Sequence, residues 1–260
     1  MSDVERIEAR AVTLGEGMLV RRALPARQRR MIGAWCFLDH AGPANFAPGQ
    51  GMQVGAHPHT ALQTFSWLIE GEVLHRDSLG SEQVIRPGQV NLMTAGHGIV
   101  HTEDSLPECG RLHLAQLWIA LPPEFADCAP AFEHYPGLPG WQQGAASLTL
   151  LAGEYAGRTS PARLYSPLLG LDICCATAAQ LALPLRPDFE YGVLPLEGSG
   201  MLGGTAFVPG ELLYLGMGDA PLVLELAAGS RVLLVGGQPF AEPVLMWWNF
   251  VGHSQEAISA

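Results

Sequence analysis

The sequence contains no lysine, and this absence excludes one kind of chemistry. All fourteen basic residues are arginines, so neither a lysine Schiff base nor a lysine general base can operate here. Positive charge is scarce as well, because the formal net charge is −11. Contacts to a phosphate backbone need clustered positive charge, and we therefore expect no direct nucleic-acid partner.

Long apolar runs are also missing. The most apolar segment, residues 168–185, is interrupted by Asp172, Gln180 and Pro184, so it cannot span a bilayer. The first six residues are polar and charged and do not resemble a secretory leader. The five cysteines are odd in number and lack the spacing of a disulfide framework, which predicts free thiols in a reducing compartment. We expect a cytoplasmic protein that does not interact with a membrane.

Turn-forming residues, by contrast, are abundant. The 31 glycines and 20 prolines are scattered along the chain, which favours short strands joined by tight turns and predicts an all-β protein. Alternating apolar residues predict a strand over 63–69, which turns at Glu70-Gly71 into a return strand over 72–76. Further predicted strands cover 99–103, 112–121, 147–151, 168–174, 180–185, 191–196, 210–215, 222–226 and 231–235.

A linker and a weak internal repeat predict that these strands form two β-barrels. Residues 122–146 hold several Pro and Gly with little periodicity, which predicts a linker. The second half weakly repeats the first, because Leu196-Glu197-Gly198 resembles Ile69-Glu70-Gly71. Residues 147–240 contain no histidine, so we expect the second barrel to be a copy without chemistry.

The predicted domains are therefore an N-terminal metal-binding barrel at 1–130, a C-terminal barrel without metal ligands at 147–240, and a tail at 241–260. The tail concentrates the aromatic residues Trp247, Trp248 and Phe250. We expect these aromatic side chains to be buried as the tail packs back on the first barrel, and we expect a short helix near the end of the chain.

Two pairs of ligand-type residues are separated by 44 positions. His57 and His59 form one pair, and His101 and Glu103 form the other. Residues two apart on a strand project from the same face. If the two strands face each other inside a barrel, three imidazole nitrogens and one carboxylate oxygen meet, and this set suits a divalent transition metal. The alternative is four unrelated polar residues on separate turns, against which the repeated spacing argues.

Three other polar residues allow more than one interpretation. His40 could be a ligand, but it has no partner two residues away, so we expect a hydrogen-bonded structural histidine at the end of a strand. His75 either supports the metal ligands from behind or is exposed and paired with its charged neighbours. Gln116 either hydrogen-bonds a ligand or substrate oxygen, or is structural. The arginine-dense segment 21–30 is either a patch that binds an anion or a partner or, as we expect, a solvated turn balanced by the surrounding acidic residues.

The motifs around the histidine pairs resemble known families. Residues 51–71 resemble the first motif of the cupin superfamily, with Gly51 before the His57-x-His59 pair and Gly71 after the following strand. The glutamate position of that motif falls around Gln63 or Thr64, neither of which is an anionic ligand. The carboxylate comes from Glu103 in its place. Four segments closely resemble the pirin family, and the resemblance is strong over residues 20–121. These segments are 37–43, 57–64, 69–80 and 94–103.

The resemblance implies a bicupin, that is, two tandem cupin barrels with jelly-roll-like strands. It further implies that the N-terminal barrel holds iron, most simply Fe²⁺, through His57, His59, His101 and Glu103. A mixed site of three nitrogens and one oxygen also accepts Mn, Co, Ni, Cu or Zn. The implied activity is that of a quercetin 2,3-dioxygenase, with a flavonol-like aromatic substrate and O₂. As a hypothesis, Glu103 accepts a hydroxyl proton of the substrate as general base, and ring cleavage releases carbon monoxide.

The resemblance leaves two alternatives open. One is a non-enzymatic, iron-dependent regulatory protein that acts through a protein partner, as a transcriptional co-regulator or a modulator of a metabolic enzyme. In this case a change between the ferrous and ferric states of the iron would alter the surface that binds the partner. The other is a cupin isomerase or a dioxygenase that acts on a different substrate.

Overall fold

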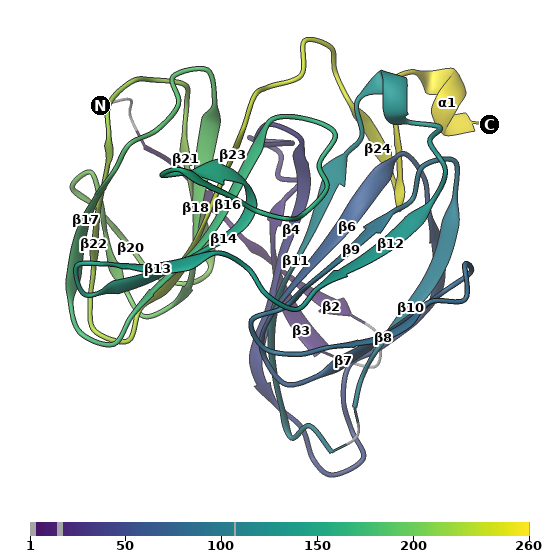
Figure 1. Ribbon diagram of the computed structural model, residues 1–260, viewed down its shortest axis with the longest axis horizontal. Helices are drawn as coiled ribbons and strands as arrows, with labels where there is room; N and C mark the ends of the chain where they lie inside the picture. Colours follow the sequence, from purple (N-terminus) through teal and green to yellow (C-terminus); the bar gives the residue numbers. More distant parts are fainter. Residues whose placement is uncertain (1–3, 15–17, 107, 260) are drawn as a thin grey trace. The chain divides into compact units, whose positions relative to one another are not determined.

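The computed structural model describes residues 4–14, 18–106 and 108–259, and strands make up most of it (Figure 1). The prediction of an all-β fold is confirmed. Of the N-terminal residues discussed above, 1–3 lie outside the described part. The chain divides into two compact units. We call the unit made of Ala11–Arg22, Cys36–Gly137 and Phe240–Ala260 the N-terminal barrel, and the unit made of Met1–Arg10, Ala23–Trp35 and Leu138–Pro239 the C-terminal barrel. The domain boundaries proposed from the sequence stay predictions.

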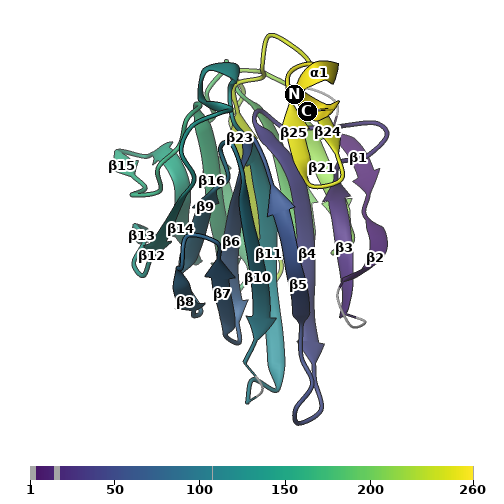
Figure 2. The ribbon, with the colours of Figure 1, turned by 90° about the vertical axis from the view of Figure 1, so that its right-hand side faces the viewer.

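The N-terminal barrel is built from two antiparallel sheets. The larger has seven strands in the order β12-β9-β6-β11-β4-β3-β2, and the smaller has four in the order β5-β10-β7-β8 (Figure 2). The strands of the larger sheet are β2 (Arg10–Leu14), β3 (Met18–Leu24), β4 (Trp35–Asn45), β6 (Leu62–Glu70), β9 (Val90–Thr94), β11 (Arg111–Ala120) and β12 (Ala131–Tyr135). Those of the smaller sheet are β5 (Gln53–His59), β7 (Val73–Asp77), β8 (Glu82–Ile85) and β10 (Ile99–Ser105).

The burial patterns of two strands explain how the sequence places the candidate site. The first seven residues of β6 are all buried, as expected for a central strand covered on both faces. In β10 the odd-numbered residues are buried and the even-numbered ones are less so, which turns His101 and Glu103 to the inside. Gly96 fixes the loop before β10, since its φ is +52° and a Cβ there would lie 1.9 Å from the carbonyl oxygen of Cys128. Only glycine meets both conditions.

The C-terminal barrel has the same two-sheet construction. Its larger sheet has eight strands in the order β1-β21-β18-β23-β16-β14-β13, with β15 paired to β14, and its smaller sheet has the order β17-β22-β19-β20. The bounds are β1 (Glu5–Glu8), β13 (Gly140–Gln143), β14 (Ala146–Tyr155), β15 (Arg158–Thr159), β16 (Leu168–Cys175), β17 (Ala179–Leu183), β18 (Glu190–Glu197), β19 (Gly200–Leu202), β20 (Thr205–Phe207), β21 (Glu211–Leu215), β22 (Leu222–Leu226) and β23 (Arg231–Gly237). The edge strand β1 therefore comes from the start of the chain.

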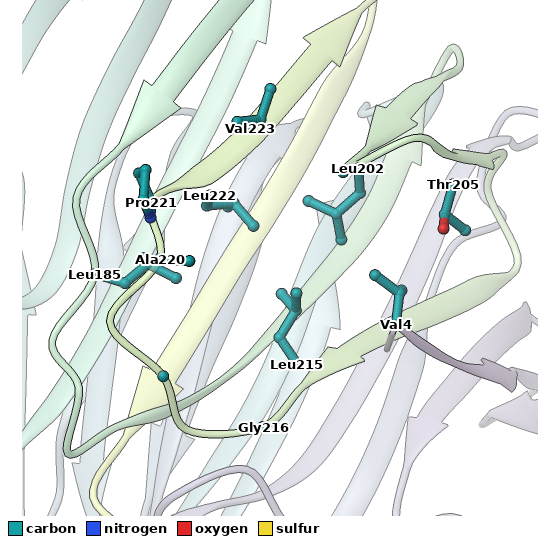
Figure 3. Close-up of a pocket in the computed structure, with 12 residues that line it drawn as sticks. Val4, Leu185, Leu202, Thr205, Leu215, Gly216, Ala220, Pro221, Leu222 and Val223 are labelled. Carbon is teal, nitrogen blue, oxygen red and sulfur yellow. The ribbon is translucent and has the colours of Figure 1, made fainter. Parts of the chain in front are cut away.

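The interior of the C-terminal barrel is aliphatic. Its core is a cluster of buried side chains dominated by leucine and valine. A pocket of about 180 Å³ opens in this barrel, and Figure 3 shows Leu202, Leu215 and Leu222 pointing toward one another in it. None of the twelve residues that line this pocket is titratable. The pocket therefore offers neither a metal ligand nor an acid–base group.

The tail packs on the N-terminal barrel, as predicted. It contains β24 (Leu245–Trp247), β25 (Phe250–Gly252) and the short helix α1 (Gln255–Ser259), which Figure 1 shows in yellow. The backbone N–H of Val251 donates to the carbonyl of Thr60 at 3.2 Å. Nε2 of His253 donates to the carbonyl of Leu121 at 2.8 Å. Among the described residues, no helix is long and apolar enough to cross a membrane.

Two expectations about this fold are wrong. Residues 122–146 are not an irregular linker, because they contain the 3₁₀ turn η1 (Pro123–Phe125) and the strands β12 and β13, which pair with β9 and β14. The tail tryptophans are not buried either, since Trp247 is 62% exposed and Trp248 is 59% exposed. A hairpin that is anchored by its backbone can leave its side chains in solvent.

Candidate metal centre

The strands that carry the two ligand pairs are neighbours in one sheet. β5 and β10 are antiparallel and hydrogen-bonded, with His57 opposite His101 and His59 opposite Ile99 (Figure 2). The expectation that the two strands face each other across the barrel interior is therefore wrong. The histidine side chains of the two strands nevertheless converge, because side chains on the same face of adjacent strands lie within contact distance.

Three imidazoles meet on the inner face of this sheet. Nε2 of His59 lies 3.1 Å from Nε2 of His101. The ring centroid of His57 lies 4.4 Å from that of His101 and 4.9 Å from that of His59. One nitrogen of each of the three rings falls within 4.8 Å of the others. This spacing allows all three rings to reach one cation.

Hydrogen bonds on the far side of each ring select its tautomer. Nδ1 of His57 lies 2.8 Å from the carbonyl of Gly55, and Nδ1 of His59 lies 3.2 Å from the carbonyl of Asn249. A carbonyl only accepts, so both Nδ1 atoms carry the proton and both Nε2 atoms present a lone pair. The donor set therefore fits a transition metal, since neutral imidazole nitrogens are its common ligands.

The third imidazole is oriented by a histidine and a carboxylate. Nε2 of His75 lies 3.1 Å from Oδ2 of Asp77, and Nδ1 of His75 lies 3.4 Å from Nδ1 of His101. Since the carboxylate accepts the Nε2 proton, Nδ1 of a neutral His75 accepts from Nδ1–H of His101. His75 is only 2% exposed and its ring stacks on Phe132. Of the two alternatives left by the sequence, the structure thus favours support of a ligand from behind over an exposed ion pair.

Glu103 lies deeper than the three histidines. A register shift falls between His101 and Glu103, and the carboxylate comes within 4.8 Å of nitrogens of His75 and His101 rather than joining the His57–His59–His101 group. It nevertheless lines the same cavity as those three histidines. The hydroxyl of Ser66 lies 3.1 Å from Oε1 of Glu103 and 2.8 Å from Oε1 of Gln116. Gln116 therefore faces the site.

Burial sets the protonation states of these groups. It lowers the pKa of His57, lowers that of His59 to about 3 and lowers that of His101, where the neighbouring imidazoles add to the effect. The rings are therefore neutral at physiological pH and ready to bind a metal. Burial also raises the pKa of Glu103 to about 7, with a smaller raising effect from Asp104. In the absence of a cation, this carboxyl group is partly protonated near neutral pH.

The ligand candidates open into a cavity of about 560 Å³. One wall is a stacked pair, Phe37 and Trp118, whose ring centroids lie 4.0 Å apart at 12°. Trp118 also packs against the ring of His59 in a T-shaped arrangement, with the ring centroids 4.9 Å apart. Beside this pair, Arg22 makes two 2.8 Å hydrogen bonds to Asp39 and lies over the ring of Phe37. The aromatic wall was not predicted, although the strand pattern places Trp118 on the same face as Gln116.

A second histidine pair lies on strands β4 and β11. Nε2 of His40 lies 2.8 Å from Nε2 of His113, and both residues are buried. His40 is hydrogen-bonded, as predicted, but within β4 rather than at its end. Its partner His113 was not singled out from the sequence, because no local spacing links two residues 73 positions apart.

The fold and the site together define a bicupin with a candidate metal centre in its N-terminal barrel. Two family models match the chain, Pirin over residues 17–119 and the Pirin C-terminal cupin domain over residues 170–260. The chain belongs to the pirin family.

Named relatives agree with this assignment. The chain is 62% identical to “Putative quercetin 2,3-dioxygenase PA1205” of Pseudomonas aeruginosa, over 98% of this chain and 81% of that protein. It is 39% identical to a pirin-like protein of Caulobacter vibrioides, over 96% of this chain and 88% of that protein. A crystal structure of a quercetin 2,3-dioxygenase from Acinetobacter baumannii is 47% identical and superimposes with a TM-score of 0.96, over 98% of this chain and 86% of that one.

Proposed function

We propose that this protein is a metal-dependent dioxygenase that uses O₂ to cleave the ring of a flavonol such as quercetin. His57, His59, His101 and Glu103 would hold the divalent metal, with Fe²⁺ as the first candidate. The observation that carries the proposal is the convergence of three imidazoles whose Nδ1 protons are already committed to acceptors behind them. Their Nε2 lone pairs are then free, and because one nitrogen of each ring lies within 4.8 Å of the others, a single cation would bind all three rings.

A bound divalent metal would supply Lewis acidity toward a substrate oxygen and, if it is iron, a redox-active centre for dioxygen. The residues of this chain account for the remaining requirements. Glu103 is 9% exposed and would accept the hydroxyl proton of the substrate. Without a cation its pKa is about 7, so burial makes this carboxyl group basic enough to take up a proton near neutral pH.

Ser66 and Gln116 provide hydrogen-bond partners for Glu103 whether its carboxyl group is ionised or protonated. The Ser66 hydroxyl has one hydrogen, yet it lies within hydrogen-bonding distance of Oε1 of both Glu103 and Gln116. When Glu103 is ionised, the hydroxyl donates to the carboxylate. When Glu103 is protonated, its O–H donates to Ser66, whose hydroxyl then turns to Gln116. Both protonation states of the base are therefore hydrogen-bonded.

The cavity suits a flat aromatic substrate. Its volume of about 560 Å³ falls within the range of roughly 300–1,000 Å³ common for small-molecule sites. The stacked rings of Phe37 and Trp118 offer a planar apolar surface beside the candidate ligand His59. Membership of the pirin family and the names of the relatives above support the same substrate class.

The test is oxygen uptake with quercetin after anaerobic loading of the protein with Fe²⁺. We expect stoichiometric loss of quercetin and O₂ together with release of carbon monoxide, and we expect no reaction from protein stripped with a chelator. His57→Ala should abolish the reaction. His97→Ala, which removes an exposed histidine in the loop before β10, should not. A loaded wild-type protein that leaves both quercetin and O₂ unconsumed would refute the proposal.

A further inference from the structure

Two exposed tryptophans occupy a hairpin beside the metal cavity. β24 and β25 pair with Trp247 opposite Phe250, which leaves Trp248 and Asn249 as a two-residue loop. Trp248 has a φ of +52°, a left-handed conformation that is unfavourable for a bulky side chain. Where a two-residue hairpin loop needs a positive φ at its first position, glycine or asparagine is the preferred residue. This chain has tryptophan there, at a cost in backbone strain.

Backbone contacts hold this loop close to the candidate ligands. The carbonyl of Asn249 accepts the hydrogen bond from Nδ1 of His59 at 3.2 Å. Thr60, the residue after His59, forms a bridge to Phe250 and accepts a hydrogen bond from Val251. The loop is thus fixed to the strand that carries His59. Trp248 and Asn249 both line the cavity that contains the three histidines and Glu103.

The indole of Trp248 is exposed although it lies at this cavity. It is 59% exposed, and its ring contacts Phe250 edge-on at a centroid distance of 5.3 Å. Trp247 on the same hairpin is 62% exposed, but it does not line the cavity. A large apolar side chain in a strained backbone conformation at the mouth of a cavity is a feature that function, rather than folding, explains.

We propose that Trp248 determines the substrate specificity of this site by forming an outer aromatic wall of the metal cavity. This inference rests on the proposed function. Phe37 and Trp118 provide an aromatic surface beside His59, and Trp248 provides a second one on the tail. A substrate whose extended planar ring system reaches beyond the metal contacts both surfaces, whereas a single-ring catechol contacts only the inner one. Trp248 therefore favours polycyclic substrates over monocyclic ones.

The first experiment compares binding of quercetin and catechol under anaerobic conditions, by calorimetry on metal-loaded protein. We expect Trp248→Ala to weaken quercetin binding about tenfold, which corresponds to about 1.4 kcal/mol, and to leave catechol binding unchanged. Trp248→Phe should restore most of the affinity, since a ring remains available for stacking. Trp247→Ala is the matched control, because it removes an equally exposed indole from the same hairpin, and it should change neither affinity.

The second experiment separates this role from a structural one. We expect Trp248→Ala to melt at the wild-type temperature, and Trp248→Gly to melt at the same or a higher temperature because glycine tolerates a positive φ. Both variants should show the same weakened quercetin binding. Lower melting temperatures in both variants, with quercetin and catechol weakened equally, would assign Trp248 a structural role and overturn the inference.

The outcomes also distinguish this inference from the proposed function. A wild-type protein that binds quercetin tightly without cleaving it would refute the dioxygenase proposal, and the inference would still be decided by the Trp248→Ala affinity. Active wild-type protein whose quercetin affinity and KM are unchanged by Trp248→Ala would refute the inference alone. Wild-type protein that does not prefer quercetin to catechol would also overturn it.

Discussion

Nδ1 of His75 lies 3.4 Å from Nδ1 of His101, and the opposite nitrogen of His75 lies 3.1 Å from a carboxylate oxygen of Asp77. This arrangement determines which nitrogen of His101 is free for a metal. Asp77→Asn should therefore lower metal affinity by about 10- to 100-fold, the usual effect of removing a hydrogen-bond partner behind a ligand. The amide oxygen can still accept the hydrogen bonds that Asp77 receives from the backbone of Leu79 and Ser81, so the turn is kept.

Competition with a chromophoric chelator measures this affinity. Glu82→Gln is the control, because Glu82 lies on the neighbouring strand β8 and pairs with Arg76 at the exposed surface. It should leave the affinity unchanged. Equal metal affinity in Asp77→Asn and wild-type protein would contradict the role given to His75.

The second prediction separates metal binding from proton transfer at Glu103. Glu103→Gln keeps an oxygen near the metal and a hydrogen-bond partner for Ser66, but it cannot accept a proton at neutral pH. We expect the variant to retain most of its metal while turnover with quercetin falls by about 10² to 10⁴, the usual contribution of a general base. Metal analysis and oxygen uptake on the same preparation measure both quantities.

The control for this prediction is Glu70→Gln, which neutralises a partly exposed carboxylate at the end of β6 that pairs with Arg111. Its turnover should equal that of the wild type. If Glu103→Gln also kept wild-type turnover, Glu103 would not be the base.

The candidate ligands could be predicted from the sequence because their signal is local. Two ligand-type residues at i and i+2 share one face of a strand whatever surrounds that strand, and His57, His59 and His101 do converge. What could not be predicted is how the two strands meet. They pair side by side, and a register shift between His101 and Glu103 sets the carboxylate apart from the other two histidines. Such a bulge depends on the partner strand, which a single-strand pattern does not contain.

Long-range contacts limit the prediction of the fold in the same way. The strand pattern predicted an all-β chain, but it could not indicate that β1 at the start of the chain pairs with β21 in the C-terminal barrel. The burial of His75 against Phe132 also depends on residues far apart in sequence. For Trp248 the prediction from the sequence was wrong. The concentration of aromatic residues in the tail predicted that its side chain is buried, but it is 59% exposed and lines a cavity.

The buried pair His40 and His113 should serve stability rather than metal binding. Nε2 of one ring lies 2.8 Å from Nε2 of the other, and burial, aided by His113 and Arg21, lowers the pKa of His40 to about 3. His113→Ala leaves a buried ring nitrogen of His40 without this partner. We expect it to lower the free energy of unfolding by about 1 to 3 kcal/mol, as measured by urea denaturation, and to leave the metal content of the folded protein unchanged. A folded variant that had lost its metal would link this pair to the metal centre.

Metal affinity should depend on pH chiefly through Glu103 between pH 5 and 7. The pKa of this carboxyl group is raised to about 7, so below pH 7 a proton must leave before the oxygen can bind a cation. Affinity should therefore fall about tenfold for each pH unit below 7, the expected effect of one competing proton. The imidazoles contribute less to this dependence, because burial lowers the pKa of His57 and of His101 and lowers that of His59 to about 3. Glu103→Gln has no such proton, and its weaker affinity should vary less with pH over the same interval. A variant that kept the wild-type slope would show that another group, and not Glu103, competes with the metal for the proton.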